Sequence, residues 1–211
     1  VKLNKLYPHT VQAVYNMLYQ SGKSAKTIKN INGVLSKALS QAEKMGYIRS
    51  NPCKACVLPR IAKKEIKPLN DAQINMFLKS IGEDRYKNVF LFALFTGMRQ
   101  SEIIGLTDDC IDFEKGTVRI YRQLQYNEFK KSYHFETLKN GRERTIKPPD
   151  TVFDILRSEM VKRAKNQLSC GDIWKNQEGF VFTMEDGRHI KHYNLYAHFK
   201  KIVKSIGLDE V

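Results

Sequence analysis

Arg99 occupies a position at which an arginine needs an anionic partner. It follows the apolar run LFALFTGM (residues 91–98), and Glu102 comes three residues later. A guanidinium at the end of a buried segment loses hydration unless an anion meets it. The anion is either Glu102, in an ion pair at helical spacing, or a substrate phosphate, which the planar arginine fork matches with two parallel hydrogen bonds. In the second case, Glu102 orients the guanidinium.

The cysteines and histidines give no pattern typical of a metal site. Cys53 and Cys56 are spaced as Cys-x-x-Cys, but no second Cys/His pair follows at the spacing of a zinc site. His189 and His192 are spaced for one helical face, without carboxylates to complete a site. We therefore expect structural cysteines, surface histidines and no metal. A Gly-rich nucleotide-binding loop is also missing from the sequence, so we expect no cofactor.

The composition predicts a globular protein of one or two domains. The chain has 211 residues, of which 42% are hydrophobic. No apolar run approaches the roughly 18–20 residues that cross a bilayer, so we expect no membrane association. Four cysteines in a chain of this length favour a reducing compartment such as the cytoplasm. The initial Val1 favours a fragment of a longer protein.

Positive charge is concentrated in the first third of the chain. The net charge is +14. Residues 1–67 carry 13 lysines and arginines against two acids, for +11, and residues 68–211 carry 23 against 20, for +3. This asymmetry indicates a module that binds a polyanion, joined to a second domain with a different task.

Two helices are expected in this basic module, over residues 9–20 and 24–45. Ser24 is a suitable N-cap for the second helix. At about 100° per residue, its apolar residues share one face, and four lysines fall on the opposite face: Lys26, Lys29, Lys37 and Lys44. A lysine face is often only solvated. Because Glu43 is the only acid in this helix, we expect these lysines to contact phosphates.

The remainder predicts an α+β fold that is mainly helical, with a small antiparallel sheet. The Pro-rich, basic segment 51–70 is typical of a linker. Helices are expected over 70–80, where Asn70 and Gln73 form a capping box, over 89–95 as a buried helix, and over 99–106, 150–168 and 192–206. Strands are expected over 111–113, 117–123 and 180–182, with a hairpin within 132–148 that turns at Asn140-Gly141.

Three segments resemble those of a known family. TGMRQSEIIGL (96–106), followed by IDFEKGTVRI (111–120), resembles the first-arginine box of the tyrosine recombinase, or phage integrase, family. LKNGRERTI (138–146) is similar to the family's β-hairpin with its catalytic lysine. The first 67 residues, which contain GYIRSNP (46–52), resemble the later helices of the family's core-binding domain.

The resemblance implies a site-specific DNA recombinase of a phage or other mobile element, acting in DNA integration. Such an enzyme cuts DNA through a 3′-phosphotyrosine intermediate and needs no cofactor. Arg99 would stabilise the charge of the transition state, with Glu102 and Arg144 in supporting positions. Lys139 would protonate the 5′-oxygen leaving group, unless it is only a solvated turn lysine. Lys26, Lys29, Lys37 and Lys44 would bind double-stranded DNA, on which four protomers would assemble in the bacterial cytoplasm, at the nucleoid.

The resemblance also assigns domains. Residues 1–58 would be a partial core-binding domain, 59–67 a linker, and 68–211 a catalytic domain without its C-terminal part. None of the histidines has an arginine three residues later, so the family's His-x-x-Arg box is missing. We assign no nucleophilic tyrosine in this chain and expect it to bind DNA without cutting it. The alternatives are an architectural DNA-binding protein of the same fold and, more distantly, an RNA-binding module.

Overall fold

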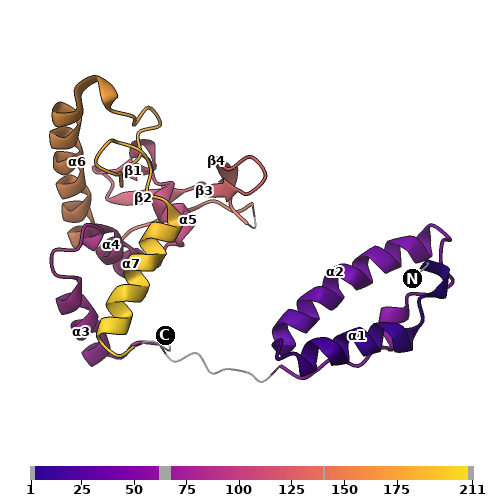
Figure 1. The fold of residues 1–211 in the computed structure, drawn as a ribbon. Coiled ribbons are helices and arrows are strands. Elements are labelled where there is room, and N and C mark those ends of the chain that lie inside the picture. Colours follow the sequence, from indigo (N-terminus) through magenta and orange to yellow (C-terminus); the bar gives the residue numbers. More distant parts are fainter. Residues whose placement is uncertain (1–2, 62–67, 140, 209–211) are drawn as a thin grey trace. The chain divides into compact units, whose positions relative to one another are not determined.

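The chain forms two compact units, Val1–Ile66 and Lys67–Val211. The computed structural model describes residues 3–61, 68–139 and 141–208. Figure 1 shows a helical first unit and a mixed second unit, and each is described by itself. The predicted α+β class with mainly helical content is confirmed.

The first unit is built on two helices, α1 (Pro8–Gln20) and α2 (Ala25–Lys44), which run antiparallel (Figure 1). Short 3₁₀ helices span Leu3–Lys5 and Pro52–Ala55. Both predicted long helices are confirmed. The Ser24 hydroxyl accepts a hydrogen bond from the Thr27 amide at 3.1 Å, as expected of an N-cap.

The core of the first unit covers only part of the apolar face of α2. Ile28 and Leu39 are buried with the side chains of α1 and with Cys53. The Asn51 amide donates to the Ser36 carbonyl at 2.9 Å, which holds the segment after α2 against that helix. By contrast, Val34 is 75% exposed. The apolar stripe is therefore wider than the surface that this unit buries.

The helices of the second unit are α3 (Asp71–Ile81), α4 (Lys87–Thr96), α5 (Gln100–Ile104), α6 (Asp150–Cys170) and α7 (His192–Ser205). The predicted capping box of α3 is confirmed, because Asn70 and Gln73 each accept the other's backbone amide through the side chain. The prediction that α4 is wholly buried is wrong at its C-terminal end, where Leu94 and Phe95 are 40% and 43% exposed. The other face of α4 supplies Val89, Phe90 and Phe92 to the core.

Two small antiparallel sheets complete this unit. One has the order β1-β2-β5 and contains Ile111–Asp112, Thr117–Ile120 and Arg144–Ile146. The other pairs β3 (Arg122–Asn127) with β4 (Ser132–Thr137). The predicted hairpin within 132–148 is therefore wrong, because β4 pairs with β3 and β5 pairs with β2.

The turn between β3 and β4 explains this difference. The Asn127 side chain accepts the amides of Phe129 and Lys130, each at 3.0 Å, and Lys131 adopts a left-handed conformation with φ 49°. These contacts close a hairpin one strand earlier in the sequence than expected. Gly141 of the predicted turn has φ 63°, while Asn140 lies outside the described residues.

The predicted strand 180–182 is reduced to a single bridge between Thr107 and Phe180. Phe180, Val181 and Phe182 are all buried in the core of the second unit, so burial explains their apolar character. In the described ranges, every helix is too short or too polar to traverse a bilayer.

Candidate active site

The α4–α5 turn places Arg99 at the start of a short helix. Gly97 ends α4 in the left-handed conformation with φ 61°, which glycine adopts without a steric penalty. Met98 is buried and anchors the turn. Arg99 follows with an extended backbone as the N-cap of α5. Its side chain therefore projects from the turn between α4 and α5. The sequence Thr-Gly-Met-Arg thus specifies both the break and the position of the guanidinium.

Glu102 is the buried centre of the site, with 1% of its side chain exposed. Its Oε1 accepts hydrogen bonds from Arg99 Nη1 and from Arg144 Nη1, both at 3.0 Å. Its Oε2 accepts the Arg99 amide at 2.9 Å and Arg144 Nη2 at 2.6 Å. A carboxylate has about four lone-pair sites. The acid is therefore saturated, and it holds two guanidinium groups in fixed positions.

The ionisation of this cluster follows from its geometry. Burial raises the pKa of the Glu102 carboxyl, but hydrogen bonds from Arg144 and Arg99 outweigh burial and leave the pKa below its usual value. The same hydrogen bonds raise the pKa of the Arg144 guanidinium. Glu102 is therefore ionised at neutral pH, and one carboxylate with two guanidinium groups gives the cluster a net charge of +1.

The two interpretations of Arg99 prove compatible. The ion pair with Glu102 exists, yet the Arg99 side chain is 62% exposed. Among the described residues, no acceptor meets its other side-chain N–H groups. Arg99 can thus be held by Glu102 on one side and bind an oxyanion on the other.

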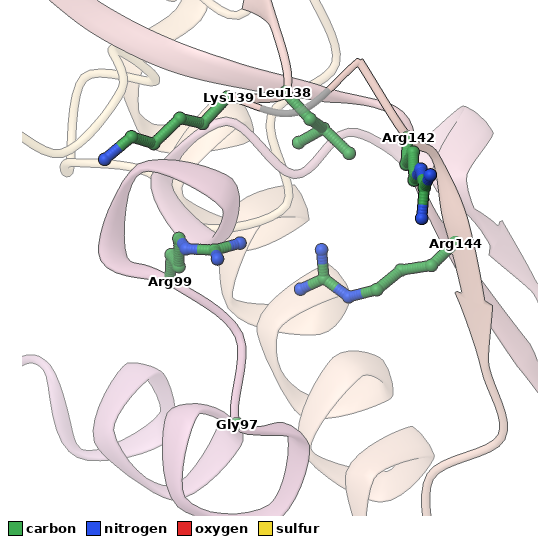
Figure 2. A pocket seen from close by; sticks show the side chains of 6 residues that line it. All are labelled: Gly97, Arg99, Leu138, Lys139, Arg142 and Arg144. Atoms are coloured by element: carbon green, nitrogen blue, oxygen red, sulfur yellow. The ribbon is translucent and has the colours of Figure 1, made fainter.

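Arg99 borders a hollow of about 440 Å³, shown in Figure 2. The lining residues are Gly97, Arg99, Leu138, Lys139, Arg142 and Arg144. The sequence-predicted residues Arg99, Lys139 and Arg144 are therefore brought together, with Glu102 beneath them. Four cations line the hollow and one buried acid supports it, for a net charge of +3. Such a surface suits an anion with several oxygens.

Arg142 is not among the site residues predicted from the sequence. A usable signal was present, because Arg142 precedes Arg144 by two residues, and alternate residues of an extended segment face the same side. Figure 2 shows both side chains directed into the hollow from the chain that leads into β5.

The predicted lysine face lies in the other unit. Lys26, Lys29, Lys37 and Lys44 are all exposed on α2. Glu43, the only acid of that helix, is held by Lys54 at 2.8 Å. The four lysines thus keep their charge unopposed by an acid of their own helix.

The cysteines and histidines hold other positions. All four cysteines are free thiols, and Cys53 is buried against Tyr15. The prediction that His189 shares a helical face with His192 is wrong, because α7 begins at His192. His192 Nδ1 lies 2.7 Å from the Tyr133 hydroxyl instead. Over the described ranges, no three Cys, His, Asp or Glu side chains gather as a metal site would require.

Comparisons with known proteins all point to one family. The model of the phage integrase family matches residues 59–211. A protein named tyrosine recombinase XerC-like, from Caldanaerobacter subterraneus subsp. tengcongensis, is 32% identical over 99% of this chain and 57% of its own length. An integrase of Saccharopolyspora erythraea is 23% identical over 97% of this chain and 58% of its own. This chain thus spans somewhat more than half the length of these relatives.

A solved structure shows the same fold. The Tn1549 transposon integrase in complex with transposon right end DNA superposes with a TM-score of 0.82 and 23% identity, over 98% of this chain and 66% of that one. At this identity, the likeness supports the architecture alone. The family match covers nearly three quarters of the chain and includes every residue that lines the hollow. The chain belongs to the phage integrase family.

Proposed function

We propose that this chain is the DNA-binding part of a tyrosine-type site-specific recombinase, and that the hollow beside Arg99 receives the phosphodiester that is cut. One observation carries the proposal: Glu102 fixes Arg99 and Arg144 side by side and leaves exposed N–H groups of Arg99 beside Lys139. We further propose that residues 1–58 form a partial core-binding domain, 59–67 a linker and 68–211 a catalytic domain.

The geometry suits phosphoryl transfer without a metal. In the proposed reaction, a tyrosine of the longer protein attacks the phosphorus and forms a 3′-phosphotyrosine bond while the bond to the 5′-oxygen breaks. Arg99 binds the non-bridging oxygens, where negative charge accumulates in the transition state. Arg144 holds Glu102, and Glu102 holds Arg99. Lys139 gives its proton to the departing 5′-oxygen, a role that contributes roughly 10²–10⁴-fold to rate.

Double-stranded DNA is the proposed partner. The integrase of Tn1549 was solved with transposon DNA, and lambda integrase was solved as a tetramer bound to a Holliday junction. We infer that the longer protein likewise assembles as four protomers on two duplexes, in the cytoplasm where bacterial DNA lies. The lysine face of α2 binds backbone phosphates and contributes affinity without sequence preference.

Trapping of a covalent adduct tests this function. A nicked duplex with the attachment site is mixed with this chain, with the longer natural protein, and with its Arg99→Ala form. We expect a denaturant-resistant adduct only with the longer wild-type protein. If Arg99→Ala formed the adduct as the wild type does, the ion pair of Arg99 with Glu102 would be purely structural. Tight, salt-sensitive binding without an adduct from any form would favour an architectural DNA-binding protein.

A further inference from the structure

Arg142 and Lys139 are the two cations of the hollow that no acid of the described residues holds. Arg99 and Arg144 both bind Glu102, whose acceptor sites are filled. Arg142 is exposed and lines the hollow, with neither a hydrogen bond nor an ion pair to the described part of the chain. Lys139 is equally unpaired, but it already has a place in the proposed reaction. A guanidinium beside three other cations costs electrostatic energy unless an anion enters.

The acid next to it in the sequence is held elsewhere. Glu143 binds Arg119 of β2, with Oε2 at 2.7 Å from Nη2 and 3.2 Å from Nε. Arg119 pairs with Thr145 in the sheet, so this contact joins the segment before β5 to the neighbouring strand β2. The pair thus keeps Glu143 from neutralising Arg142. It also fixes the backbone on which Arg142 stands.

We propose that Arg142 binds a DNA phosphate next to the one held by Arg99, on the same strand, and so positions the duplex for cutting. This inference rests on the proposed function of the hollow. Each strand of a duplex carries a charge about every 3.4 Å along its axis, so a hollow of about 440 Å³ that admits one phosphate also meets its neighbour. Figure 2 shows Arg142 across the hollow from Arg99, on the side of Arg144, where such a neighbour would lie.

The salt dependence of binding tests this role. This chain is titrated against a labelled duplex over a range of salt concentrations, as wild type and as Arg142→Gln, Arg142→Lys and Arg99→Gln. One phosphate contact contributes a slope of about 0.9 in a plot of log affinity against log salt. We expect Arg142→Gln to reduce the slope by about 0.9 and the affinity about fivefold at 0.15 M salt. Arg142→Lys should keep the slope, since the charge remains.

A matched control removes the same charge elsewhere. Arg157 on α6 is 60% exposed and pairs with Asp154, so Arg157→Gln should bind as wild type does. Wild-type slope in Arg142→Gln with a reduced slope in Arg99→Gln would overturn the role of Arg142 and leave the proposed function standing. Wild-type slopes in both variants would overturn the phosphate-binding hollow itself. A slope reduced equally in Arg142→Lys and Arg142→Gln, with lowered thermal stability in both, would show that Arg142 is structural.

Discussion

Glu102 shows how one buried side chain can hold a fold together and also set the geometry of a surface hollow. A buried carboxylate is unfavourable unless it is fully paired. Here three guanidinium hydrogen bonds and one backbone amide supply the pairing. The same contacts set the direction of Arg99. The stability of the second unit and the geometry of the hollow therefore depend on the same carboxylate.

Glu102→Gln should destabilise the second unit by about 2 kcal/mol, because it leaves two guanidinium groups without their counter-charge. The estimate is below the value for a fully buried pair, since Arg99 and Arg144 are 62% and 38% exposed. Urea unfolding measures the change. Asp154→Asn removes an acid from an exposed pair with Arg157 and should cost less than about 0.5 kcal/mol. Equal losses of stability from the two substitutions would show that Glu102 stabilises the fold no more than an exposed acid does.

The Glu102 contribution should also depend on pH. Since the folded-state pKa is lower than the ordinary value of 4.5, the stabilisation is fully present above that value and is lost as pH falls through the lowered pKa. The difference in unfolding free energy between wild type and Glu102→Gln should therefore shrink between about pH 5 and pH 3. A difference that stays constant over this range would contradict the pairing seen here.

Elements differ in how closely the sequence determines them. The caps at Ser24 and Asn70 and the break at Gly97 are local signals, and the helices beside them were predicted with small boundary errors. Strand pairing is non-local. Asn140-Gly141 is a strong turn signal, yet β5 pairs with β2, and Arg144 of β5 reaches Glu102 on α5.

The site residues also differ in how far the sequence alone could predict them. Arg99, Lys139 and Arg144 could be named in advance because the family pattern orders them along the chain. The spacing of Arg142 and Arg144 indicated that both face the same side, but only the structure shows that Arg119 holds Glu143 and that Arg142 has no partner among the described residues. Likewise, nothing local shows that Val34 remains exposed while Ile28 on the same helix is buried.

At the scale of elements, the packing of α5 on β3 should be sensitive to Gly105. A Cβ added there would lie 2.7 Å from the Leu124 amide nitrogen and 3.1 Å from the Ser101 carbonyl oxygen. Gly105→Ala should cost about 1–3 kcal/mol, because backbone on both sides must shift. Thermal unfolding checks this.

Gly33→Ala is the natural contrast. It lies within α2, and an added Cβ would meet nothing within 4 Å. This substitution should stabilise the helix by about 0.5–1 kcal/mol. Destabilisation at Gly33, or tolerance at Gly105, would contradict the packing described.

For the whole molecule, charge is divided unequally between the units. The first unit carries most of the excess, and the face formed by Lys26, Lys29, Lys37 and Lys44 has no acid opposing it on α2. Replacing these four lysines by glutamine should reduce the salt slope of DNA binding by up to about 3.6, if each lysine contacts one phosphate. Titration of a duplex at several salt concentrations measures it.

Lysines that are already paired provide the control. Lys87, Lys115 and Lys162 each bind a carboxylate in the second unit. Their combined replacement by glutamine should leave the slope nearly unchanged. If both sets reduced the slope equally per lysine, binding would follow net charge alone and the α2 face would not be a specific contact.

Neutralising single DNA phosphates tests most directly whether the hollow beside Arg99 holds a phosphate, as we propose. Duplexes with the attachment site are ethylated at one backbone phosphate each, and their affinity is measured for wild type and Arg99→Gln. We predict one phosphate whose ethylation weakens binding of the wild type but has no further effect on Arg99→Gln, while the other phosphates affect both proteins equally. If ethylation at every position weakened both proteins to the same extent, Arg99 would contact no phosphate, and the hollow would not be the active site.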